Sequence, residues 1–139
     1  MIADINHLKK RAHAQSFVKI QHPKECFKIS KDILPVLHHE FPETPTLNGF
    51  QPGNALATTE VIERAVNLFK NHEIHAICTN PINKEVLKKG CGFEYPGHTE
   101  YLAHLAGNNN SVMMLLCEEL RVVPTTIHIA LKDVSKLLT

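Results

Sequence analysis

One short motif places an imidazole and a hydroxyl side by side at the expected start of a helix. The segment Gly97-His98-Thr99-Glu100 follows Pro96 and precedes an apolar, helix-forming stretch. In one interpretation, His98 and Thr99 face a ligand and donate hydrogen bonds to an oxyanion or a phosphate group. In the other, Thr99 only caps the helix and His98 is a surface side chain. The motif by itself leaves both interpretations open.

His128 is the second residue that could do chemistry. It lies between Ile127 and Ile129, in a segment with the pattern of a strand. A buried histidine costs desolvation free energy unless its ring nitrogens are paired. His128 is therefore either a hydrogen-bonded strand residue or, as a neutral imidazole, a metal ligand. A metal site needs about three or four ligands, and no second ligand is adjacent in the sequence.

The third candidate is the segment Thr79-Asn80-Pro81-Ile82-Asn83-Lys84. Polar side chains at a turn from a strand into a helix can line a cleft for a phosphate or a cofactor. The same residues can instead form a capped turn with a solvated Lys84. The chain contains neither the Gly-x-Gly-x-x-Gly fingerprint of dinucleotide sites nor the Gly-x-x-x-x-Gly-Lys-Ser/Thr pattern of a P-loop. The sequence therefore assigns no catalytic residue and no cofactor-binding residue.

The elements that must position these residues begin with an amphipathic helix. Thr58 or Thr59 can cap it, and Asn71 is a suitable stop. Its apolar residues recur at helical spacing, so one face of the helix should pack on a core. They are Val61, Ile62, Ala65, Val66 and Phe69.

A strand, a turn and a second helix follow. The mostly apolar run at 74–78 has the composition of a buried strand. Asn80 as N-cap and Pro81 at the first helical position predict a helix over 82–89, which ends at Gly90. This order indicates α/β organisation, in which the carboxyl end of a strand leads into a helix N-terminus.

The rest of the chain is predicted more coarsely. A short helix begins at His98 and closes at Gly107, and strands are expected at 112–117 and 120–129. Glu118-Glu119 is the tight connection between the two strands, and 131–139 has the pattern of a helix that has just begun.

The first part of the sequence has weaker signals. Short strands are expected at 17–20 and 26–29, because each run mixes β-branched or aromatic residues with polar ones. Prolines and glycines then predict a loop over about 40–54. The triplet His38-His39-Glu40, just before this loop, is expected to be solvated.

Length and composition limit the class of protein. A chain of 139 residues suits one domain. Its 15 Lys plus Arg nearly balance its 14 Asp plus Glu, which argues against nucleic acid or an acidic membrane surface as a partner. No apolar stretch approaches the roughly 20 residues of a membrane span, and the N-terminal residues lack the pattern of a secretory signal. A cytoplasmic location is expected.

The four cysteines, Cys26, Cys78, Cys91 and Cys117, are far apart and form no Cys-x-x-Cys motif. This spacing supports neither a zinc ribbon nor a disulfide scaffold. We expect them to be reduced thiols in or near the core.

Taken in order, these motifs resemble those of the 4-hydroxythreonine-4-phosphate dehydrogenase family of vitamin B6 biosynthesis. The resemblance is dense over 54–139 and faint before it, and the order and spacing of several motifs make it specific. The matching segments are 79–84, 96–100, 112–115, 120–123 and 126–133.

The resemblance implies an α/β/α fold similar to isocitrate and isopropylmalate dehydrogenases, and a homodimer with its active site at the subunit interface. It implies NAD or NADP as cofactor and a divalent metal (zinc, magnesium or cobalt) bound by three histidines. His128 matches the first of these metal ligands, and His98 and Thr99 match positions that bind the small phosphorylated amino-acid substrate. The reaction implied is oxidation of 4-phosphooxy-threonine to a β-keto acid, which then loses carbon dioxide, in pyridoxal phosphate biosynthesis.

The chain also departs from the family pattern. The family's first strand with its Gly-rich turn is missing, as are the second half and the other two metal histidines. Ala130 stands where proline is common. The expected structure is therefore a single incomplete α/β domain over 1–139, truncated at both ends, with a weakly patterned part (1–53) and a motif-bearing part (54–139). Two alternatives remain: a non-catalytic remnant or interaction module, and a related four-carbon sugar-acid phosphate dehydrogenase.

Overall fold

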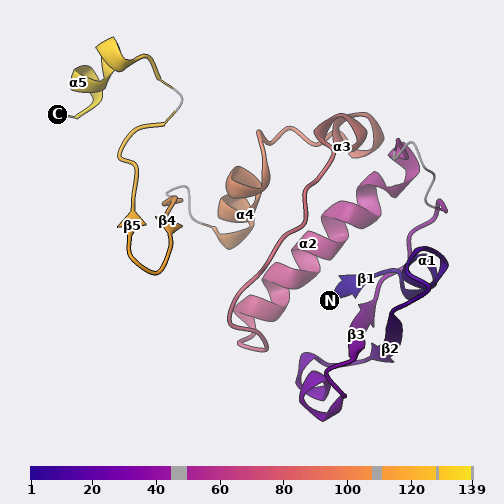
Figure 1. Cartoon of the computed structure of the whole chain (residues 1–139). Helices are drawn as coiled ribbons and strands as arrows, with labels where there is room; N and C mark the ends of the chain where they lie inside the picture. Colours follow the sequence, from indigo (N-terminus) through magenta and orange to yellow (C-terminus); the bar gives the residue numbers. More distant parts are fainter. Residues whose placement is uncertain (45–49, 108–110, 128, 139) are drawn as a thin grey trace.

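The computed structural model describes residues 1–44, 50–107, 111–127 and 129–138. A small parallel sheet lies on one side of a long helix, α2, and two shorter helices, α3 and α4, lie on the other (Figure 1). A hairpin and a last short helix follow α4 and extend away from these layers (Figure 1). The architecture confirms the predicted partial α/β fold.

The sheet has three parallel strands in the order β1-β3-β2. Helix α1 (Ile5–Arg11) connects β1 to β2 and packs on β2. The strand predicted at 17–20 is confirmed by β2. The sheet strands are β1 (Ile2–Ala3), β2 (Ser16–Ile20) and β3 (Ile33–His38).

The strand predicted at 26–29 is wrong. Residues Pro23–Lys28 form a 3-10 helix, η1, whose start is fixed by the Glu25 carboxylate. This carboxylate accepts hydrogen bonds from the backbone N–H groups of Gln21 at 3.0 Å and His22 at 2.7 Å. A proline at the first helical position and this local cap outweigh the strand propensity of the residues that follow.

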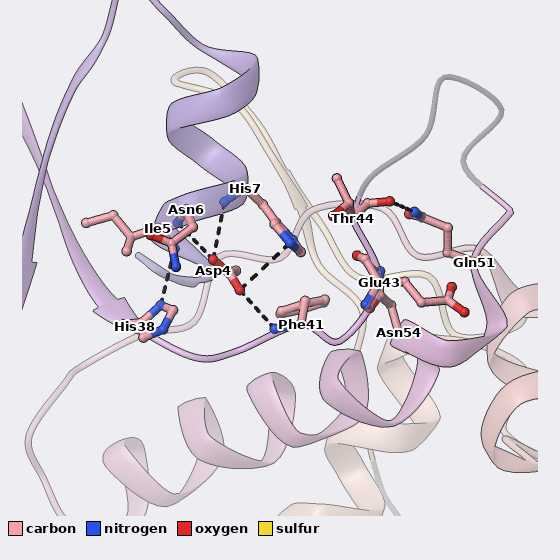
Figure 2. Close-up of polar contacts among 10 residues, drawn as sticks. All are labelled: Asp4, Ile5, Asn6, His7, His38, Phe41, Glu43, Thr44, Gln51 and Asn54. Carbon is pink, nitrogen blue, oxygen red and sulfur yellow. Dashed lines mark hydrogen bonds and ion pairs between the residues drawn. The ribbon is translucent and has the colours of Figure 1, made fainter.

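Helix α2 (Ala55–Lys70) begins earlier than predicted, directly after the 3-10 turn η2 (Pro52–Asn54). The predicted caps are wrong, because Thr58 and Thr59 lie inside the helix, where their hydroxyls donate to the carbonyls of residues 54 and 56. The buried side chain of Asn54 instead bonds both backbone groups of Glu43 at 2.8 Å, which fixes the preceding loop to the start of α2 (Figure 2).

Helices α3 (Lys84–Cys91) and α4 (His98–Ala106) pack on α2 and form the principal core. A Cβ atom at Gly90 would clash with the Pro52 carbonyl and the Ala55 side chain, so glycine permits the close approach of α3 to η2. The prediction of a helix from His98 to Gly107 is confirmed. The buried core residues are Ala55, Ile62, Val86, Leu87, Phe93 and Tyr101.

The strand predicted at 74–78 is wrong. This segment follows α2 and runs back beside it without helix or strand structure, and it has no strand partner among the described residues (Figure 1). Ile74 and Ile77 are half-buried, and the residues between them are exposed. Apolar composition alone does not make a strand, because a strand requires a neighbour that satisfies its backbone groups.

The C-terminal strands are shorter than predicted. β4 (Leu115–Leu116) and β5 (Arg121–Val122) form an antiparallel hairpin, with 117–120 as the connection. A 3-10 turn, η3 (Leu131–Asp133), and a four-residue helix, α5 (Val134–Leu137), follow and agree with the predicted start of a helix.

Candidate functional site

A cavity of about 320 Å³ lies between β1, α2, the extended segment 77–82 and the start of α4. Apolar side chains of β1, α1, α2 and the segment 77–82 form most of its wall, and three of its four polar lining residues come from the motifs at 79–84 and 97–100. Among the described residues that line it there is no carboxylate, lysine or arginine side chain. The polar lining residues are Thr58, Thr79, Asn80 and His98.

His98 reaches this cavity because it is the first residue of α4. It is half-buried, and the N-cap residue Gly97 offers no side chain to the first N–H groups of the helix. These groups and the positive end of the helix dipole favour an anion. The prediction that His98 faces a ligand stays a prediction, and its position at the cavity supports it.

The segment Thr79-Asn80-Pro81-Ile82 lines the same cavity, so two of the predicted motifs meet there. The expectation that Asn80 caps a helix is wrong. Asn83 is the cap of α3, and its side-chain oxygen accepts from Val86 N at 3.1 Å. Because the helix begins later than predicted, Asn80 lies outside it, and the residue is exposed.

Thr99 and Lys84 are not among the described lining residues of the cavity. Both side chains are exposed, at the starts of α4 and α3 respectively. A ligand in the cavity would therefore meet His98 before it meets Thr99.

His128 lies outside the described residues, so the structure places neither its ring nor its distance from His98. Its neighbours Ile127 and Ile129 are 49% and 39% exposed. The predicted strand at 120–129 has strand geometry only at β5 within its described part.

The described residues contain no group of three or more histidine, cysteine or carboxylate side chains placed to hold a metal ion. A divalent metal implied by the resemblance would therefore need ligands from outside these residues. The sequence contains no Gly-rich loop of the kind that binds the phosphates of a dinucleotide. The cavity volume of about 320 Å³ is at the small end of the range for ligand sites.

The cysteines do not form a site either. Cys26 and Cys91 are half-buried and Cys78 and Cys117 are exposed, all as free thiols. The expectation of thiols in or near the core is wrong for the exposed pair, because neither 74–78 nor the C-terminal hairpin is covered by other elements.

Asp4, which the sequence analysis missed, organises the carboxyl end of the sheet beside this cavity. Its buried carboxylate accepts from the N–H groups of Asn6 at 2.8 Å and His7 at 3.2 Å, and from Phe41 at 3.0 Å (Figure 2). Burial would raise the pKa of Asp4, but the N–H groups of Phe41, His7 and Asn6 together lower it below its ordinary value. An aspartate directly before Ile5 is the helix-start signal that could have identified it.

The expectation that His38-His39-Glu40 is solvated is wrong for its two histidines. His38 accepts from the N–H of Ile5 through Nδ1 at 3.3 Å, and His39 Nε2 lies 3.0 Å from Glu60 on α2. Both histidines are half-buried. They attach the end of β3 to α1 and α2, so they position the walls of the cavity without lining it.

On the other side of α2, the Tyr101 hydroxyl donates to Glu63 at 2.7 Å. Burial, followed by this hydrogen bond and the charge of Glu63, raises the pKa of Tyr101 well above its ordinary value. The hydroxyl therefore remains a donor at neutral pH and holds α4, with His98 at its start, against α2.

None of the helices in the described part of the chain combines the length and the hydropathy of a membrane-spanning helix.

Comparison with known proteins places these features in one family. A family model described as pyridoxal phosphate biosynthetic protein PdxA matches residues 1–139. The chain is 42% identical, over 139 residues, to a 4-hydroxythreonine-4-phosphate dehydrogenase of Roseobacter denitrificans, a match that covers 99% of this chain and 42% of the relative. It is 51% identical, over 77 residues, to a D-threonate 4-phosphate dehydrogenase of Cupriavidus necator, which covers 55% of this chain and 23% of the relative.

A solved structure shows the same fold. The crystal structure of a 4-hydroxythreonine-4-phosphate dehydrogenase from Klebsiella pneumoniae is similar with a TM-score of 0.82 and 29% sequence identity. The similarity covers 95% of this chain and 42% of the Klebsiella chain. The chain thus spans about two fifths of the length of these 4-hydroxythreonine-4-phosphate dehydrogenases.

Proposed function

The chain belongs to the family of the pyridoxal phosphate biosynthetic protein PdxA, and from this premise we propose that it supplies part of the substrate site of a 4-hydroxythreonine-4-phosphate dehydrogenase. The proposed reaction is the oxidation of 4-phosphooxy-threonine to a β-keto acid, which then decarboxylates, in pyridoxal phosphate biosynthesis. The chain alone is expected to bind the substrate without turning it over, because its described residues complete neither a metal site nor a dinucleotide site.

One observation supports this proposal most directly: His98 lines the same cavity as Thr79 and Asn80. These residues are far apart in the sequence, and each belongs to a segment singled out there for its chemistry. A cavity lined by one imidazole, a hydroxyl and an amide, next to a helix N-terminus, suits a small ligand that carries a phosphate or a carboxylate.

Each polar group has a defined task in this proposal. The His98 ring donates a hydrogen bond to a phosphate oxygen, and the first N–H groups of α4 add donors beside it. Thr79 and Asn80 can bond the substrate's hydroxyl and carboxylate. Thr99, at the exposed second position of α4, would contact the phosphate from outside the cavity.

The remaining parts of the proposal concern groups that the chain does not complete. His128 is proposed as one ligand of a divalent metal, and NAD or NADP as the acceptor of the hydride. A homodimer is proposed for the full-length assembly, and the cytoplasm as its location. The titration described below tests substrate binding in the cavity and does not depend on the metal, the cofactor, the dimer or the location.

A D-threonate 4-phosphate dehydrogenase is the second candidate, favoured by the 51% identity to the Cupriavidus relative. The two named substrates share a phosphorylated four-carbon chain and differ in an amine or a hydroxyl beside the carboxylate. The described lining contains no carboxylate that would select the amine. We therefore expect the isolated chain to bind both phosphorylated compounds with similar affinity.

Isothermal titration of the full chain with 4-phosphooxy-threonine tests the proposal. We expect binding that weakens about tenfold or more in His98→Ala, because the variant loses a charge-assisted hydrogen bond to phosphate. Unphosphorylated 4-hydroxythreonine should bind much more weakly and should be insensitive to the variant.

His13→Ala is the matched control, since His13 is an exposed histidine in the turn that follows α1 and does not line the cavity. It should bind the phosphorylated compound as the unmodified chain does. Equal affinity of the His98 variant and the control would overturn the site, and NAD reduction by the isolated chain would overturn the expectation that it lacks turnover.

A further inference from the structure

A second cavity, here called the aromatic cavity, lies where the end of α3 and the start of α4 meet α2. Its volume is about 630 Å³, well inside the range of small-molecule sites. Its wall comes from the first turns of α2, the end of α3, the loop 92–96 and Tyr101 of α4. It shares no described lining residue with the cavity that contains His98, so the two are separate sites.

Three aromatic rings form one side of the aromatic cavity. The ring centroids of Phe93, Tyr95 and Tyr101 lie 4.9 to 5.3 Å from one another. Phe93 and Tyr101 are buried and Tyr95 is half-buried, so mutual packing fixes this wall before any ligand arrives. Aromatic rings offer apolar contact area, and their faces attract cations.

The charge that faces the aromatic cavity is negative. Glu63 of α2 and Glu94 of the loop are the only charged side chains among its described lining residues. Glu63 Oε1 accepts from the Tyr101 hydroxyl at 2.7 Å, which holds this carboxylate against the rings, and a carboxylate can accept further hydrogen bonds. Cys91 and Gly92, at the C-terminal end of α3, also line the cavity, and the negative end of a helix dipole favours a cation.

This charge makes the aromatic cavity unlike the one that contains His98. The His98 cavity combines an imidazole with a helix N-terminus and has no carboxylate among its described lining residues. The aromatic cavity combines two carboxylates with a helix C-terminus. A phosphorylated substrate is repelled by the second arrangement, whereas a cation finds both acceptors and an apolar wall there.

We propose that the aromatic cavity binds a small primary ammonium ion, with its charged head near Glu63 and Glu94 and its apolar body on Phe93 and Tyr95. The ammonium N–H groups donate to the two carboxylates. Leu56, which is 58% exposed at the same cavity, adds apolar contact for the body of the ligand. The inference goes beyond the proposed function, because it assigns a different ligand to a different cavity.

Titration of the full chain with benzylammonium, followed by amide NMR spectra, tests this inference. Benzylammonium should shift the amide signals of 56–63 and 91–96, with a dissociation constant at least tenfold lower than that of benzyl alcohol, which has the same ring and no charge. Benzoate should leave these signals unchanged. Equal affinity for benzylammonium and benzyl alcohol, or shifts confined to other segments, would overturn the inference.

Two glutamine variants separate the site from the general charge of the molecule. Glu94→Gln should weaken benzylammonium binding about tenfold, because it removes one charged acceptor at an exposed position. Glu100→Gln is the matched control, since Glu100 is an exposed glutamate of α4 that is not among the described lining residues, and it should bind like the unmodified chain. Equal losses in both variants would assign the attraction to net charge and overturn the site. His98→Ala should leave benzylammonium binding unchanged, which separates this test from that of the substrate cavity.

Discussion

At the scale of single residues, the described polar side chains mainly hold elements in place. Asp4, Asn54 and Tyr101 are buried, and each makes hydrogen bonds that join two parts of the chain. His98 differs from them because it lines a cavity. A buried polar group costs free energy unless it is paired, so the three paired groups are expected to contribute to stability and His98 to binding.

The Asp4 carboxylate provides a test of this distinction. Because its folded-state pKa is lowered, its contribution is fully present above the unfolded pKa of about 4 and is lost as the pH falls through the folded pKa. Asp4→Asn keeps one acceptor oxygen and should cost about 1–2 kcal/mol at neutral pH.

Urea denaturation followed by circular dichroism measures this cost. The difference between Asp4→Asn and the unmodified chain should shrink when the pH is lowered from about 7 to about 3. The exposed Asp32→Asn is the control and should show little difference at either pH. A difference for Asp4→Asn that grows in acid would contradict the assignment.

At the scale of elements, local signals and tertiary packing compete for helix boundaries. The sequence predicts Asn80 as the N-cap of the second helix, whereas the structure shows Asn83 as the N-cap of this helix, α3. Both are asparagines near a proline, so propensity does not separate them. The later start leaves Asn80 free to line the cavity and lets the Asn83 side chain bond Val86 N.

Two alanine variants separate these roles. Asn83→Ala should destabilise the chain by about 1 kcal/mol, because α3 loses the acceptor for one of its first N–H groups. Asn80→Ala should leave the free energy of unfolding nearly unchanged and weaken binding of the phosphorylated substrate instead. Thermal unfolding and calorimetric titration of both variants measure these effects. A larger loss of stability in Asn80→Ala than in Asn83→Ala would support Asn80, not Asn83, as the N-cap of α3.

At the scale of the whole molecule, stability is divided unequally between two parts: the body (described residues 1–44 and 50–107) and the arm (111–127 and 129–138). The buried side chains lie in the body, and the arm has none among its described residues. Segments with few buried contacts open at low free-energy cost. We therefore expect the chain to lose its arm to proteases before its body is cut.

Brief trypsin treatment of the full chain tests this expectation. Arg121 and Lys132 in the arm are exposed and should be cleaved first, which leaves a fragment that contains α1 to α4. Arg64 on α2 is half-buried and donates to the His38 carbonyl at 2.8 Å, so cleavage there should be much slower. Cleavage at Arg64 as early as at Arg121 and Lys132 would contradict the lower stability of the arm. In the control, the chain denatured in urea, these sites should be cleaved in no preferred order.

The sequence by itself determined the α/β class, the strand β2, the helix from His98 to Gly107 and the motifs of the family. These depend on local signals: apolar periodicity, glycine at the helix end and short runs of β-branched residues. The sequence also proposed that His98 faces a ligand, which stays a prediction, and the residues that share its cavity could not be inferred from spacing.

Only the tertiary structure decided which strands exist and which residues share a site. β3 contains Pro35 and β1 has two residues, so neither has a clear pattern, and both exist because parallel partners pair with them. The apolar run at 74–78 has the pattern of a strand but no strand partner in the part of the chain that the structure describes. The meeting of His98 with Thr79 and Asn80 likewise follows from the packing of α4 on α2, since contacts between distant segments are not encoded in local spacing.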